Sequence, residues 1–348
     1  MKNKSKLLLI PTSFLLLTGC GTSADTSIPR GYAAIDKANP EARQAFFDKV
    51  GDNIASTYTK AVEGFMAEGS FSFKELSYQQ KMSNGKTNVL KITDFEADYS
   101  FGLVGLNEGA SKMRAVLKLE DVGFKVEVKT DKGTFKLNAS DLDAAAYYTN
   151  STLYYDLSDK NVRTFVNDAI DFSYAVEGRS DRTDKISRDK ESAAKYLGKY
   201  YVKDDDVEDV TNMLPSSLSD KEVKDLKEIV GEAFETVLAD DDVNNLLTLA
   251  EDKNSKGAAI SLALSSDPVI AGGYTVSGDL AASLVFDKQG IFSRYGFAGN
   301  VSITGSNYSF KLSKLDLGAE FKYGSNSVKL PNFKDFKELQ QRDVVIYD

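Results

Sequence analysis

FKVEVKTDKGTFKLN, residues 124–138, alternates apolar and charged side chains on both sides of a turn. The apolar members are Phe124, Val126, Val128, Phe135 and Leu137, and the charged residues between them are Lys125, Glu127, Lys129 and Lys136. A period of two residues is typical of a strand, and Asp131-Lys132-Gly133 is a typical turn. The stretch therefore predicts an antiparallel hairpin with one face in water and the other face covered.

The same alternation recurs in two blocks of sequence. The first contains residues 71–78, 99–103, 113–119 and 147–157, with a turn signal at Ser83-Asn84-Gly85. The second runs from Ala259 to about Val328, with hairpin turns expected at residues 287–290 and 324–326. The two blocks could form one long curved sheet wrapped around helices, or two sheets that each have their own helix. We favour one sheet, because the helices between the blocks have apolar stripes that need a large apolar surface to cover.

Helices are predicted before and between these blocks. Asn39-Pro40-Glu41 is a typical helix start, and an apolar residue then recurs every four positions at Phe46, Val50, Ile54, Tyr58 and Val62. Residues 161 to about 253 are charge-rich and expected to be helical, with a capping box at Ser219–Glu222. Val243, Leu246, Leu247 and Ala250 suggest a following short helix. The predicted fold class is α+β: a curved antiparallel sheet, half-barrel-like, with helices covering one face.

Composition limits the chemistry. The 348 residues include no histidine and no tryptophan, one cysteine, and a formal net charge of −9. Without histidine the usual general base and the commonest metal ligand are missing, and one cysteine can form neither an internal disulfide nor a zinc cluster. An acidic chain is a poor fit to nucleic acid. We therefore expect no enzyme activity, no cofactor, no metal and no nucleic-acid partner.

The N-terminus has the features of an export signal. Lys2, Lys4 and Lys6 precede an apolar run from Leu7 to Leu17, which is too short to span a bilayer. Leu17-Thr18-Gly19-Cys20 then resembles the bacterial lipoprotein box. The resemblance implies cleavage before Cys20 and a diacylglyceryl group on its sulfur, and two acyl chains give firm anchoring. A plain signal peptide with a chance cysteine, or a buried free thiol, is the alternative.

These features divide the chain into a signal peptide (1–19), an acylated Cys20 with a flexible tether (20–38), and a single α+β body (39–340) whose helical middle segment spans about 160–255. The expected location is the extracytoplasmic face of the cell membrane.

The body also resembles a known superfamily. The aromatic hairpin at residues 144–161, the turn at 287–290 and the closing Lys329-Leu330-Pro331, together with the lipoprotein box, are similar to the lipoprotein half-barrel superfamily, which includes the LolA/LolB carriers and the mycobacterial LprG and LppX lipoproteins. The resemblance implies a bent sheet with an apolar cavity that receives acyl chains, and it assigns no individual binding residue. The long charged middle, with Asp204–Asp206 and Asp240–Asp242, departs from it and could fill that cavity.

Other motifs have simpler interpretations. Asp252 to Gly257 begins like a calcium loop, but Lys256 and Ala263 stand where ligands are needed, so a turn is expected. Unspaced aspartates are typical of helix N-termini or solvated surfaces. Tyrosines 147, 148, 154 and 155 are expected to pair across strands rather than to stack on sugars.

The leading hypothesis is a non-catalytic carrier or sensor of an apolar, lipid-like ligand, with a cavity lined by residues such as Phe124, Val126, Phe297 and Leu312. The second is an interaction module without a pocket that binds another envelope protein. A carboxylate-based hydrolase is a weaker third hypothesis.

Overall fold

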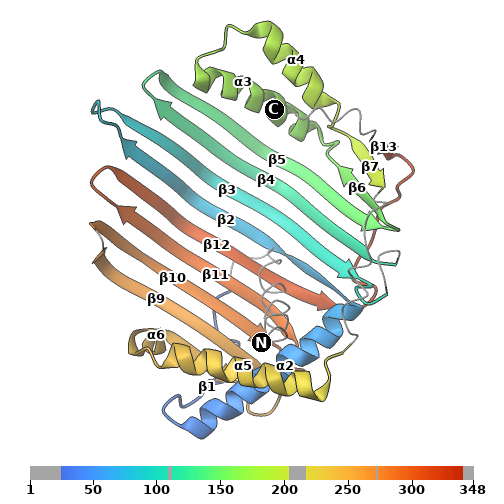
Figure 1. Cartoon of the computed structure of the whole chain (residues 1–348), viewed down its shortest axis with the longest axis vertical. Coiled ribbons are helices and arrows are strands. Elements are labelled where there is room, and N and C mark those ends of the chain that lie inside the picture. Colours follow the sequence, from blue (N-terminus) through green and yellow to red (C-terminus); the bar gives the residue numbers. More distant parts are fainter. Residues whose placement is uncertain (1–24, 109–111, 204–216, 272, 340–348) are drawn as a thin grey trace.

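Two blocks of strands that lie far apart in the sequence join side by side in one sheet (Figure 1). The structure is a computed structural model, and it describes residues 25–108, 112–203, 217–271 and 273–339. In these ranges the sheet has 13 strands in the order β1-β8-β9-β10-β11-β12-β2-β3-β4-β5-β6-β7-β13, all antiparallel except the parallel pair β7–β13. The strands are β1 (Ala33–Ala34), β2 (Gly64–Lys81), β3 (Thr87–Val104), β4 (Arg114–Thr130), β5 (Gly133–Thr149), β6 (Thr152–Asp156), β7 (Lys199–Lys203), β8 (Leu247–Glu251), β9 (Ala258–Ala271), β10 (Tyr274–Phe286), β11 (Phe292–Thr304), β12 (Tyr308–Tyr323) and β13 (Lys337–Glu338).

The junction between the two blocks is the pairing of β12 with β2. Phe310 lies opposite Tyr78, and Phe321 lies opposite Ala67. The prediction of one long sheet is therefore confirmed. The fold is α+β with a large, curved, mostly antiparallel sheet that does not close on itself.

In the described part of the chain, five helices lie in two groups at opposite ends of this sheet (Figure 1). One group contains α2 (Pro40–Glu63), α5 (Asp220–Leu238) and α6 (Asp241–Leu246), and the other contains α3 (Lys160–Glu177) and α4 (Thr183–Ala194). The predicted stripe of α2 is buried against α5 and the sheet: Phe46 and Val50 belong to a core with Leu226 and Val230 of α5.

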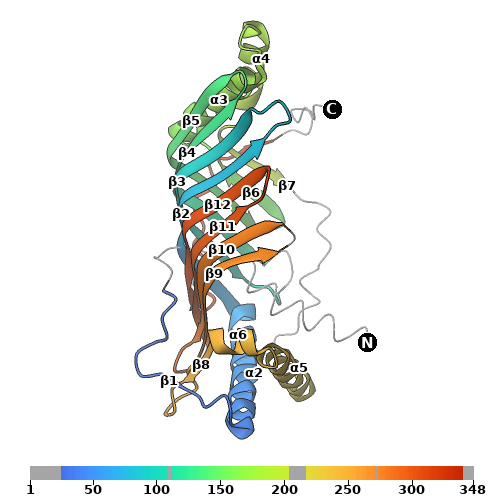
Figure 2. The same ribbon diagram turned by 90° about the vertical axis from the view of Figure 1, so that its left-hand side faces the viewer.

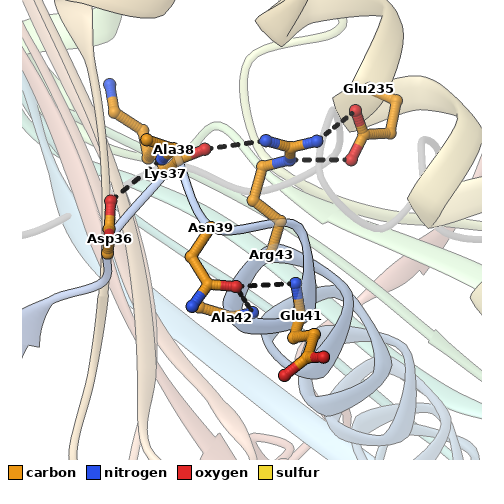
Figure 3. A network of polar contacts seen from close by, with 8 residues as sticks. All are labelled: Asp36, Lys37, Ala38, Asn39, Glu41, Ala42, Arg43 and Glu235. Atoms are coloured by element: carbon orange, nitrogen blue, oxygen red, sulfur yellow. Dashed lines mark hydrogen bonds and ion pairs between the residues drawn. The ribbon is translucent and has the colours of Figure 1, made fainter.

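The start of α2 follows the sequence prediction and shows how α2 and α5 are joined. The Asn39 side chain accepts hydrogen bonds from the N–H groups of Glu41 and Ala42 (Figure 3). One turn later the guanidinium of Arg43 donates to Glu235 of α5 at 2.9 Å and to the Lys37 carbonyl at 2.8 Å (Figure 3). The capping box at Ser219–Glu222, which opens α5, is also confirmed.

Most of the predicted turns are present. Turns at 83–85, 131–133 and 287–290 connect neighbouring strands, and the side chain of Asp287 accepts from the N–H groups of Gln289 and Ile291. The turn at 324–326 is different. Gly324 follows β12, but the next strand along the chain is β13 at one edge of the sheet, beside β7, so the prediction of a hairpin there is wrong.

A row of left-handed residues crosses the sheet. Asp94 in β3, Asp121 in β4, Asp141 in β5 and Lys314 in β12 have φ of 52°, 54°, 51° and 51°, and the strand registers of β3–β4, β4–β5 and β11–β12 shift nearby. Such bulges insert an extra residue and bend a strand. Because the extra residue also shifts the alternation by one, the apolar face continues across the bulge, as from Ile92 to Phe95 in β3.

Two segments differ from the sequence predictions. The middle segment, predicted to be helical, also contains β7 and β8, so Leu247 and Ala250 lie in a strand and not in the expected short helix. Residues 25–38, expected to be tether, pack on the body: Ala33 pairs with Glu251, and the Ser283 hydroxyl donates to the Asp25 carbonyl. Part of the stretch expected to be a tether therefore contacts the sheet in the described structure.

Candidate functional site

One face of the sheet is apolar on both sides of the bulge row, and we call it the apolar face. On one side of the row, Val126 lies opposite Ile92, which lies opposite Leu76. Phe124 precedes Val126 by two residues in an unshifted stretch of β4, so the two side chains share a face. Phe124 stacks on Phe95 across the row, with ring centroids 6.1 Å apart. The apolar face therefore continues across the bend.

The opposite face carries charged side chains over much of its area, and at one end Val116 and Tyr147 form a second core there with Val328, Phe333 and Phe336. Cross-strand ion pairs follow one another along this face: Lys91–Glu75 at 3.2 Å, Lys136–Glu127 at 3.3 Å, and Lys322–Glu68. Exposed pairs of this kind contribute little to stability, but they identify the solvent side of the sheet. The prediction for residues 124–138 is confirmed in detail, since Val126–Leu137 and Val128–Phe135 are direct cross-strand partners.

The two helix groups cover the apolar face only at its ends. At one end α2 and α5 bury Leu284, Tyr295 and Phe321 among other strand residues. At the other end Phe165 of α3 meets Phe124 edge to face at 5.5 Å. The sequence predicted that this face would be covered. Among the described residues no helix covers its middle, because α2 packs on β2, β9, β11 and β12 at one end of these strands and α3 packs on β5 (Figure 1).

An open groove of about 260 Å³ lies in this middle region. It is lined by Phe71, Phe95, Ala97, Tyr99, Leu119, Val122 and Leu317, from β2, β3, β4 and β12. Its floor is rigid, because Phe95 stacks on Phe73 at 4.9 Å with the rings 4° from parallel, and Phe71 packs on Phe95 at 5.0 Å. One wall is loosely packed: Leu119 is 41% exposed.

The groove is suited to hydrocarbon. Except for Tyr99 its lining side chains are wholly apolar, so a ligand there would gain affinity from removal of apolar surface from water and not from hydrogen bonds. The expected lining residues are placed nearby and not in the groove. Phe124 extends the aromatic row beside it, Phe297 is the cross-strand partner of the lining residue Leu317, and Val126 and Leu312 lie beyond the bulge row.

A second cavity of about 580 Å³ lies beside α2 and α5 and is polar. Its charged side chains are held by structural contacts: Asp52 pairs with Lys227 at 2.8 Å, and Lys49 pairs with Glu251 at 2.5 Å. The buried amide of Asn53 donates to the Lys256 carbonyl at 2.8 Å. These contacts join α2 to α5 and to the turn after β8.

A third cavity of about 280 Å³ brings together the carboxylates of Glu120, Asp143, Asp156 and Asp159. Asp159 caps α3, and Asp143 accepts from the Asp121 N–H at 3.0 Å. Burial would raise the pKa of Asp156, but hydrogen bonds from Ser158 and Lys199 outweigh it and hold that pKa below its usual value. Asp156 is therefore ionised near neutral pH and is not a proton donor there.

The other residues singled out in the sequence pair across strands, cap helices or stabilise turns. Tyr147 lies opposite Tyr154 in the β5–β6 hairpin, as predicted, and both rings are covered by Phe333. Asp240 caps α6, with Asp241 and Asp242 in its first turn. Asp252 accepts from the Asn254 N–H in the turn between β8 and β9. Cys20 and Asp204–Asp206 lie outside the described residues.

The groove residues were missed by sequence reasoning, although the sequence contains a signal for them. In β3 the apolar residues have even numbers up to Ile92, as in Leu90, and odd numbers from Phe95 onward, as in Ala97. The change falls at Asp94, the left-handed residue. Such a change in the apolar alternation at an aspartate predicts a bulge. A bulge at this point would have placed Phe95 on the same face as Ile92.

Comparison with known proteins does not assign a family: no protein-family model matches the chain, and no curated protein is similar enough to count as a relative. In the described ranges every helix is too short or too polar to cross a membrane. Within the same ranges no group of three or more Cys, Asp or Glu side chains is arranged to hold a metal ion.

Proposed function

We propose that the protein is a non-catalytic lipoprotein that carries or senses an apolar, lipid-like ligand at the extracytoplasmic face of a membrane. The observation that supports carriage is the groove lined by Phe71, Phe95 and Leu119, which lies open between two helix-covered ends of the apolar face. A soluble domain normally covers so much contiguous apolar surface, and an uncovered stretch is typical of a binding site.

Lipid analysis of the purified full-length chain tests carriage. We expect native mass spectra to contain a bound mass, and solvent extraction to release a lipid with acyl chains in near-stoichiometric amount. A groove-blocking variant, Leu119→Glu, should lose that mass, whereas Leu153→Glu, at a similarly exposed position away from the groove, should keep it. Repeated absence of bound lipid from the unmodified chain contradicts carriage.

The anchoring part of the proposal rests on the lipoprotein box at Leu17–Cys20. A diacylated cysteine would hold the body at the membrane, because each buried CH₂ contributes about 0.8 kcal/mol. Cys20→Ala should therefore release the protein from the membrane fraction or leave an uncleaved precursor. If neither fractionation nor precursor size changes, the anchoring proposal is wrong.

A second candidate function is binding of an envelope protein, and one observation favours it. β8 pairs with β9 only along Ala258–Leu262. Among the described residues, residues 263–271 therefore pair with β10 on one side and with no strand on the other. Open edges accept added strands, although Pro268 removes one backbone donor from this edge. A photo-crosslinker at Ser265 should then give one discrete adduct in cells. No adduct from Ser265, together with bound lipid in the groove, would contradict this candidate.

A further inference from the structure

Four hairpin turns lie in a row at one end of the sheet. They connect β9 to β10, β11 to β12, β2 to β3 and β4 to β5, and because neighbouring strands are antiparallel, all four point in the same direction (Figure 1). In the turned view they project toward the side of the sheet on which α5 lies (Figure 2). The end of α3 contacts one of the four turns, since the Lys132 side chain donates to the Glu177 carbonyl at 2.7 Å, and the groove residues lie away from this end.

Exposed apolar side chains gather at this end on the apolar face. We define the tip surface as Tyr78, Leu90, Val269, Tyr274, Val276 and Tyr308. The six are contiguous: Leu90 lies opposite Tyr78, Val269 lies opposite Val276, and the Tyr308 ring lies 6.3 Å from Tyr78 and 5.2 Å from Tyr274.

These side chains are unusually open for their type. Tyr78, Leu90, Tyr274 and Val276 are 37–41% exposed, and Val269 is 56% exposed. Ile270, beside the β9–β10 turn, is 79% exposed, and Met82 in the β2–β3 turn is 40% exposed. A patch of aliphatic and tyrosine side chains spread over five strands is typical of an interaction surface and not of scattered surface residues.

The charges around the tip surface indicate the kind of partner. The protein has a net charge of −9, yet the described residues of the four turns and their immediate flanks contain Lys81, Lys86 and Lys132 and a single carboxylate, Asp131. Lys86 lies 3.9 Å from Asp131. Lysine is depleted from protein–protein interfaces, whereas lysines beside exposed aliphatic and tyrosine side chains are typical of surfaces that contact lipid headgroups and the outermost acyl carbons.

We infer that this end of the sheet docks on a lipid bilayer with its turns foremost. Val269 of the tip surface and Ile270, on the other face of β9, then enter the interface, with the tyrosine hydroxyls at headgroup level and Lys81 and Lys86 facing anionic phosphates. Neither an acyl chain on Cys20 nor a ligand in the groove is required for this contact. The inference therefore goes beyond the proposed carrier function, and it gives such a carrier a defined orientation on the membrane.

The absence of tryptophan from the whole sequence provides a clean reporter. Single-tryptophan full-length chains with Ile270→Trp or Leu153→Trp are mixed with vesicles of phosphatidylcholine and phosphatidylglycerol. We expect the emission at position 270 to shift to shorter wavelength and to be quenched by brominated acyl chains. Position 153, which is 43% exposed and lies in the β5–β6 hairpin at the other strand ends, should not respond.

The control separates this contact from anchoring, because an acylated Cys20 alone requires neither position to enter the acyl region. No shift at position 270, or equal shifts at both positions, overturns the inference. In the Ile270→Trp chain, the added changes Lys81→Glu and Lys86→Glu should raise the vesicle concentration at half saturation by about tenfold. An unchanged titration overturns the role given to the lysines. A concentration-dependent shift without vesicles would assign the tip surface to a second copy of the chain and also overturns it.

Discussion

Truncation of Leu119 tests the groove most directly. Leu119 lines the groove and is 41% exposed in the chain without ligand. Full burial of a leucine side chain contributes about 1.5–3 kcal/mol, so a ligand that covers the exposed part would gain about 0.6–1.2 kcal/mol from this side chain. Leu119→Ala should therefore raise the Kd for an apolar ligand roughly 3- to 8-fold.

The matched control is Leu153→Ala. Leu153 is 43% exposed, lies on β6 and does not line the groove. Both truncations remove a partly buried leucine, so both should lower the free energy of unfolding by a similar amount, about 1–2 kcal/mol. Only Leu119→Ala should weaken binding. A third variant, Leu119→Glu, places a charge in an apolar site and should weaken binding more than the alanine variant.

The assay is displacement of an environment-sensitive fluorescent fatty acid from the purified chain, with urea unfolding of each variant measured in parallel. The absence of tryptophan keeps intrinsic emission low. Equal changes in Kd for Leu119→Ala and Leu153→Ala would mean that affinity follows general stability. In that case the groove is not the binding site.

Three further predictions concern stability. Phe47 is fully buried and stacks on Phe234 at 5.1 Å, so Phe47→Ala should lower the free energy of unfolding by about 3–5 kcal/mol in a urea titration; a loss below about 1 kcal/mol would mean that α2 and α5 do not form the core. Asp121 has φ of 54°, so Asp121→Gly should be neutral or slightly stabilising while Asp121→Val costs about 1–2 kcal/mol; equal midpoints for the two variants would contradict a bulge there. The pKa of Asp156 is lowered in the folded chain, so its stabilisation is complete above the unfolded value of about 3.9 and is lost as the pH falls through the folded pKa. The difference in Tm between the unmodified chain and Asp156→Asn should therefore shrink below about pH 4, and a difference that is constant from pH 7 to pH 2 would contradict the lowered pKa.

The candidate site shows how far sequence reasoning reaches. Alternation at Val126 and Val128 is enough to place one apolar face, and the structure confirms it. Which part of that face stays open depends on where the helices pack, and this is set by contacts such as Phe47 on Phe234, nearly 190 positions apart in the chain. The expected lining residues were therefore on the correct face but at the wrong place along it.

The sequence by itself determined the local features: the cap at Asn39, the capping box at Ser219, the turns at 131–133 and 287–290, and the period of the long strands. Each depends on hydrogen bonds or backbone preferences within a few residues, so each can be recognised from a short stretch. Tertiary structure alone decided the pairing of β12 with β2, the recruitment of β7 and β13 to one edge, and the uncovered middle of the apolar face. These depend on which distant surfaces bury most apolar area against each other, and alternation in one strand contains no information about its partner.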